Sequence, residues 1–260
     1  MKIFILGDLE GTAGVVDFRQ QTYSDAKYYE QAKRLATLEV NALAEGALEA
    51  GATELWFLDG HGPGGMDYEL IHPEVQMIIG RPIPVPWGLD ESFDALFLYG
   101  HHSMANTDRG VLCHSWSSRA IANCWLNGEL IGEIGFNAAI AGSFGIPTTF
   151  ISGDDTAVAE AQQYVPNIVS VTTKKGISQT SALSLAPAKA RDLLRAGGRE
   201  AVERGTEITP FTISPPYEFI TERLTEEAVD SKAKQSHVER LDSHKYKVIG
   251  ETLIEIAQRR

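Results

Sequence analysis

The chain has 260 residues, of which 43% are hydrophobic and 22% are charged, a composition typical of a globular protein. Its formal net charge of −12 argues against nucleic-acid binding, because that function needs a basic surface to neutralise phosphates. No apolar run reaches the roughly 18 residues of a membrane span. The first run stops at Asp8, too soon for a secretory signal, so we expect a cytoplasmic protein with no membrane partner.

Two cysteines, Cys113 and Cys124, are too few for a disulfide framework, and we expect both thiols to be reduced.

Strand-like and helix-like patterns alternate over the first 150 residues. Ser24 is a plausible N-cap for the first long helix, and Gly51 ends it. Asn127-Gly128 is a strong signal for a two-residue hairpin turn. In chain order, we expect a strand at 2–7, a helix at 25–50, strands at 54–58, 75–79 and 95–99, a hairpin at 119–131, a helix at 133–144, a strand at 148–151 and a helix at 186–204.

The pattern changes after Thr209, where Pro215-Pro216 interrupts the chain. Two strand-plus-helix units follow, and we expect the last helix near 246–258. The alternation predicts an α/β fold with a mostly parallel sheet flanked by helices, and a smaller C-terminal α/β subdomain. We place the catalytic α/β domain at 1–180 and the C-terminal region at 181–260.

Acidic and histidine side chains follow several of the strand-like runs. Asp8 and Glu10 come after KIFILG, His61 after ELWFLDG, His101 and His102 after ALFLYG, and His114 after GVLC. The carboxyl ends of parallel strands share one edge of a sheet, and ligands bind there. We therefore expect these side chains to converge in space.

The residue types at this edge suit a metal centre. Imidazoles and carboxylates together are good ligands for zinc. Two ions about 3.5–4 Å apart, bridged by a carboxylate, can activate a water molecule and polarise a carbonyl oxygen. The motif D-x-E-G is weak alone, but its combination with DGH, GHH and CHS is much stronger.

These motifs resemble those of the zinc D-aminopeptidases first known from bacterial dipeptide-permease operons. The resemblance covers roughly residues 1–215, in order and with the right spacing. It rests on the strings GDLEGTAG (7–14), LDGHG (58–62), LFLYGHHSMA (96–105), GVLCHS (110–115), GELIGEIGFNA (128–138) and ISGDD (151–155).

The resemblance implies two Zn²⁺ ions per chain and five metal ligands, with Asp8 bridging the ions. The implied ligands are Asp8, Glu10, His61, His102 and Glu133. It also implies that His114 is the catalytic residue. In the family this residue is described as a nucleophile. A histidine beside an activated water could equally be a general base or acid, and the sequence leaves both roles open.

Some positions need a choice. The GHH string offers two histidines, and we assign His102 as the ligand because it keeps the spacing to GVLCHS. His101 would then point the opposite way as a structural residue. A metal-bound histidine needs a partner on its other ring nitrogen, and Asp59 is a candidate partner for His61. Asp154-Asp155 fits a helix N-cap pair better than a ligand pair.

The resemblance implies cleavage of short peptides, with D-Ala-containing dipeptides as substrates. It also implies a ring-shaped homo-oligomer, a decamer in the family, that encloses its active sites.

Two other functions stay open. A two-metal phosphoester hydrolase has similar ligands, although Arg81, Arg109 and Arg119 form no obvious phosphate cluster in the sequence. A non-catalytic metal-binding α/β module would bind metal without turnover.

Overall fold

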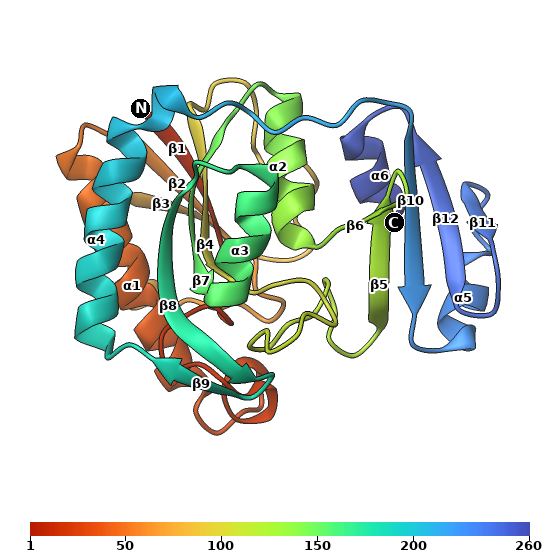
Figure 1. Cartoon of the computed structure of the whole chain (residues 1–260), viewed down its shortest axis with the longest axis horizontal. Coiled ribbons are helices and arrows are strands. Elements are labelled where there is room, and N and C mark those ends of the chain that lie inside the picture. Colours follow the sequence, from red (N-terminus) through yellow and green to blue (C-terminus); the bar gives the residue numbers. More distant parts are fainter.

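The computed structural model describes all residues, 1–260, and places a large sheet beside a smaller one (Figure 1). The large sheet has seven strands in the order β3-β2-β1-β4-β7-β8-β9. All neighbours in it are parallel except the antiparallel pair β8 and β9. Its strands are β1 (Lys2–Gly7), β2 (Glu54–Asp59), β3 (Val75–Ile78), β4 (Ala95–His101), β7 (Thr148–Asp154), β8 (Val169–Ser178) and β9 (Ser181–Ser184).

Helices cover both faces of the large sheet (Figure 1). Side chains alternate along β1, so Ile3 and Ile5 face one core while Phe4 and Leu6 face the other. The first core contains α1 (Tyr29–Glu49) and α4 (Pro187–Glu203), and the second contains α2 (Glu133–Ser143) and α3 (Asp155–Tyr164).

The predicted α/β fold with a mostly parallel sheet is confirmed. The first long helix starts later than expected. It begins at Tyr29, and its cap residue Tyr28 makes no side-chain capping bond, so Ser24 is not the N-cap. The hairpin forms as predicted, with Asn127 and Gly128 both at positive φ.

The smaller sheet has five strands in the order β11-β12-β10-β5-β6. They are β5 (Ile121–Leu126), β6 (Glu129–Leu130), β10 (Tyr217–Arg223), β11 (Val238–Arg240) and β12 (Lys245–Gly250), accompanied by α5 (Glu226–Lys232) and α6 (Leu253–Arg259). The last helix therefore starts after residue 246, because Tyr246 lies in β12. The smaller sheet takes strands from both sides of residue 180, and the division at that residue stays a prediction.

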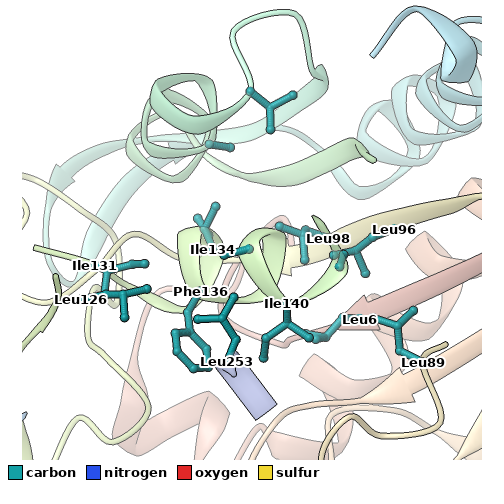
Figure 2. Close-up of a cluster of buried hydrophobic side chains, with 14 of the residues drawn as sticks. Leu6, Leu89, Leu96, Leu98, Leu126, Ile131, Ile134, Phe136, Ile140 and Leu253 are labelled. Carbon is teal, nitrogen blue, oxygen red and sulfur yellow. The ribbon is translucent and has the colours of Figure 1, made fainter. Parts of the chain in front are cut away.

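Helix α2 packs between the two sheets. Every residue from Ile134 to Gly142 is buried, which is the pattern of a helix with no solvent-facing side. Figure 2 shows Ile140 of α2 beside Leu6 of β1, and Phe136 beside Leu253 of α6. This core fixes the N-terminus of α2 against the strand ends of the large sheet.

None of the helices combines the length and the apolar composition needed to cross a bilayer.

Candidate metal centre

The strand order reverses between β1 and β4, which are neighbours in the large sheet although far apart in sequence. Such a switch point opens a crevice at the carboxyl ends of the strands. Asp8 follows β1, and His102 follows β4. His61 comes from the end of β2, on the other side of β1. The chain therefore brings its polar strand ends to the place where an α/β sheet binds ligands.

The strand ends approach so closely that glycine is needed at residue 100. Gly100 has φ +68°, and a Cβ atom there would lie 2.3 Å from the carbonyl oxygen of Asp8. The Gly11 amide also donates to the Gly100 carbonyl at 2.6 Å. This contact holds the Asp8–Glu10 segment against the end of β4.

Six side chains that could bind a metal ion form two groups of three. Within each group the ligand atoms lie within 4.8 Å of one another. The first group is Asp8, Glu10 and His61, and the second is His102, His114 and Glu133.

Asp8 connects the two groups. Its Oδ1 is 3.1 Å from Nδ1 of His61, and its Oδ2 is 3.5 Å from Nε2 of His102. Burial by itself would raise the pKa of the Asp8 carboxyl, but the imidazoles of His102 and His61 hold that pKa well below its usual range. Asp8 is therefore an anion with one oxygen toward each group, as a bridging ligand requires.

A backbone carbonyl lies beside each of the three imidazoles. Each has one ring nitrogen within hydrogen-bonding distance of a backbone carbonyl: His61 Nε2 at 2.8 Å from Thr22, His102 Nδ1 at 3.0 Å from Ser103, and His114 Nδ1 at 2.8 Å from Leu112. When this nitrogen donates, the other nitrogen of the neutral ring is free to bind a metal or a proton. For His61 the partner is Thr22 and not Asp59, which instead accepts from the Gly65 amide.

The donor set fits two metal ions. Nε2 of His102 is buried without a hydrogen-bond partner, although carboxylates of Asp8 and Glu133 lie 3.5 and 3.7 Å away. Burial alone would lower the pKa of His102, but these carboxylates raise it to about 10. A cation is thus favoured between these groups, and a metal ion would supply that charge in place of the imidazole proton.

His114 reaches the site from a loop and not from a strand. The GVLC run, expected to be strand-like, forms turns, and Leu112 has φ +55°. The His114 ring stacks on that of His102, with centroids 3.8 Å apart. Burial, followed by the nearby charge of His102, lowers the pKa of His114. The His114 ring is therefore neutral near pH 7, with Nε2 able to accept a proton.

Tertiary hydrogen bonds hold the His114 loop. The Val111 amide donates to Oδ2 of Asp154 at 2.8 Å, and the His114 amide donates to the Ser103 carbonyl. Asp154 is also the N-cap of α3 through its other oxygen, as the sequence predicted. One carboxylate therefore ties a helix start to the loop that carries His114.

Glu133 is the first residue of α2. Its Oε1 accepts a hydrogen bond from the Trp116 amide at 2.5 Å, and a carboxylate is favourable at this end of a helix. His101 is fully buried at the end of β4 and belongs to neither group.

Lys174 is buried next to the segment that carries Glu10, and no sequence motif pointed to it as part of the site. It comes from β8, is 1% exposed, and donates to the carbonyls of Glu10, Thr12 and Val15. Burial lowers the pKa of Lys174 to about 8. Its ammonium group thus fixes the backbone of the segment that carries Glu10.

A cavity of about 220 Å³ opens onto the centre. Its lining includes Asp8, Glu10, His61, His114 and Glu133 of the centre. The other lining residues are Thr22, Tyr23, Gly60, Gly62, Pro63, Trp116 and the segment 117–119.

Comparison with known proteins gives a consistent result. The model of the peptidase family M55, described as D-aminopeptidase, matches residues 1–259. The chain belongs to the D-aminopeptidase family. A D-aminopeptidase of Bacillus subtilis (strain 168) is 32% identical over 221 residues, which cover 83% of this chain and 78% of that protein.

A solved structure of the family supports the same assignment. The Zn-dependent D-aminopeptidase DppA from Bacillus subtilis, described as a self-compartmentalizing protease, matches with a TM-score of 0.94 at 27% identity. The match covers 100% of this chain and 95% of that one, so the D-aminopeptidase fold extends through both sheets.

Proposed function

We propose that this chain is a binuclear-zinc aminopeptidase that removes the N-terminal residue of short D-amino-acid peptides such as D-Ala-D-Ala. The observation that carries the proposal is the position of Asp8, whose two oxygens face two separate groups of metal-binding side chains. Membership of the D-aminopeptidase family supports the substrate class, and the zinc dependence of DppA supports the metal.

The proposed ligands are Asp8, Glu10 and His61 on one side, and Asp8, His102 and Glu133 on the other. When bound, two zinc ions would polarise the scissile carbonyl and lower the pKa of a water molecule. Fixed carbonyl partners keep the ligating nitrogens of His61 and His102 pointed into the centre, so little reorganisation is needed on binding.

His114 is the proposed catalytic residue. Its Nδ1 lies 2.8 Å from the Leu112 carbonyl, and donation to that oxygen leaves Nε2 free to take or return a proton. The lowered pKa of His114 supports a role as proton acceptor near neutral pH. The alternative roles are direct attack by Nε2 and metal ligation, since the ring lies in the second group of donors.

The cavity offers a single arginine, and no cluster of cations, to a phosphate. Arg81 is occupied, because its guanidinium donates to the carbonyls of Asp59 and His61. Arg119 is the one lysine or arginine that lines the cavity, and Arg109 does not line it. A phosphoester hydrolase is therefore a weaker proposal than a peptidase.

We also propose a closed homo-oligomer with the active sites inside, because DppA is described as self-compartmentalizing. The cytoplasmic location and the decameric count stay predictions. Light scattering on the purified chain would give the number of subunits.

The deciding experiment measures hydrolysis of D-Ala-D-Ala and L-Ala-L-Ala by protein stripped of metal and then reconstituted with zinc. We expect zinc to restore cleavage of the D-peptide alone. Cleavage of neither peptide, with zinc bound, would contradict the aminopeptidase proposal and favour a non-catalytic module.

A further inference from the structure

Arg119 lies at the cavity of the proposed metal centre, two residues before the start of β5. Among the 14 residues that line this cavity, it is the one lysine or arginine. The other charged lining groups are the carboxylates of Asp8, Glu10 and Glu133, together with the histidines of the centre. A single arginine therefore shares this cavity with the proposed metal-binding groups.

The guanidinium of Arg119 has no anionic partner in the protein. No carboxylate oxygen lies within 4.0 Å of it, whereas the exposed arginines Arg195, Arg199 and Arg240 each form an ion pair. Asp25 lines the adjoining hollow without reaching ion-pair distance. Arg119 also makes no hydrogen bond to a backbone carbonyl, in contrast to Arg81, so its donors are available to a ligand.

Arg119 is nevertheless held in place. Its guanidinium carbon lies 3.7 Å from the centroid of the Tyr23 ring, a cation–π contact. The Tyr23 hydroxyl is 3.4 Å from the Ser118 hydroxyl, which connects the two segments. Because Tyr23 contacts the flat face of the guanidinium, the N–H donors along its edge remain free to bind a planar carboxylate.

A dipeptide carries its own carboxylate close to the bond that is cut. One residue separates the scissile carbonyl from the C-terminal carboxylate, a span of at most about 3.6 Å along the chain. A dipeptide whose scissile carbonyl lies over the metal-binding groups must therefore place its carboxylate inside the same cavity.

We propose that Arg119 binds the C-terminal carboxylate of the substrate and makes the enzyme select free dipeptides. The inference rests on the proposed aminopeptidase function and names the substrate end that the cavity recognises. Arg119 is a specificity residue in this proposal, and His114 and the metal ligands remain responsible for the chemistry.

The test compares D-Ala-D-Ala with D-Ala-D-Ala amide, which has the same scissile bond but no terminal charge. We expect the wild type to have a kcat/KM for the free acid about 10- to 100-fold above that for the amide, the range for one hydrogen-bonded charge pair. Arg119→Gln should remove this preference, chiefly through a higher KM for the free acid, and leave the amide within about threefold.

Two further variants make the comparison specific. Arg119→Lys keeps the charge without the fork and should retain part of the preference. Arg109→Gln removes an arginine that is 60% exposed and outside the cavity, and should leave the preference unchanged.

The outcomes separate the inference from the function on which it rests. An Arg119→Gln variant that keeps the wild-type preference, or loses both activities equally, would overturn the role of Arg119 alone. A wild type that cleaves neither compound after zinc reconstitution would overturn the aminopeptidase function, and the Arg119 inference with it.

Discussion

The two halves of the metal centre are built in different ways. Asp8, Glu10 and His61 come from the ends of adjacent parallel strands, β1 and β2, whose register fixes their separation. His102, His114 and Glu133 come from a strand end, a loop and a helix start. The first half depends on the sheet, and the second depends on packing between segments that are distant in the sequence.

This difference predicts which substitutions affect each half. The backbone of the first half is held by hydrogen bonds to buried polar side chains, chiefly Lys174 and Glu39. The second half is supported by the hydrogen bond that Asp154 accepts from the Val111 amide, by the one that the Trp116 amide donates to Glu133, and by the buried helix α2. Substitutions that weaken one support should change the metal affinity of one half more than that of the other.

The largest effect is expected from Asp8→Asn, because Asp8 has one carboxylate oxygen facing each half. We expect a loss of both zinc ions and a fall in kcat/KM of more than about 10⁴-fold, beyond what a single acid–base residue contributes. Zinc content by atomic absorption and peptide hydrolysis would measure the two effects. Asp108→Asn, whose side chain is 95% exposed, is the matched control. Retention of two zinc ions by Asp8→Asn would show that Asp8 is not the bridge.

His114→Gln tests the second half. As an acid–base residue, His114 should contribute about 10²- to 10⁴-fold to the rate, so activity should fall by that factor while two zinc ions remain bound. A variant that keeps only one zinc ion would instead identify His114 as a ligand. Near wild-type activity would exclude both roles.

Lys174→Met tests the support of the first half. The change leaves the carbonyls of Glu10, Thr12 and Val15 without their donor, and we expect the free energy of unfolding to fall by about 3 kcal/mol. The affinity of the first half for zinc should fall about 10- to 100-fold, as for other residues that orient ligands. Urea denaturation and competitive zinc titration are the measurements, and the exposed neighbour Lys175→Met is the control. Equal losses in both halves would argue against a separate support.

Glu39 gives a smaller, pH-dependent effect. Burial raises the pKa of its carboxyl to about 7, although the Tyr99 hydroxyl and the Ala13 amide both donate to it. Because the folded-state pKa is raised, the contribution of Glu39 to stability is complete below about pH 4.5 and is lost as the pH rises through 7. The contribution is at most about 3 kcal/mol.

Glu39→Gln should therefore reduce the decline in stability between pH 4.5 and 7 relative to the wild type. Thermal unfolding across this range would measure it, with Glu30→Gln, whose side chain is 79% exposed, as a control on the same helix. Parallel pH profiles for the wild type and Glu39→Gln would contradict the shifted pKa.

The sequence predicted the first half for a physical reason. Asp8, Glu10 and His61 directly follow apolar runs, and parallel strands place such residues at one edge. The sequence also selected His114, but the strand expected before it is a loop. Hydrogen bonds to Asp154 and Ser103, which are not neighbours of the loop in the sequence, hold that conformation. No local pattern encodes such contacts.

Two other features were beyond the reach of local patterns. Lys174 appears in the sequence as one of two adjacent lysines, and its partners Glu10 and Thr12 lie more than 160 residues away. The strands β8 and β9 and the addition of β5 and β6 to the C-terminal sheet also went unpredicted, since pairing between distant strands is set by the assembled core.

The burial of α2 on all sides has a consequence for how this enzyme can diverge. A position that contacts neighbours on every side accepts few replacements, because gained or lost volume costs stability. A saturation scan should therefore find the positions from Ile134 to Gly142 among the least tolerant in the chain. Glu133 is attached to that helix, so descendants of this sequence can change their substrate more readily through the cavity walls around Tyr23 and Arg119 than through the ligands.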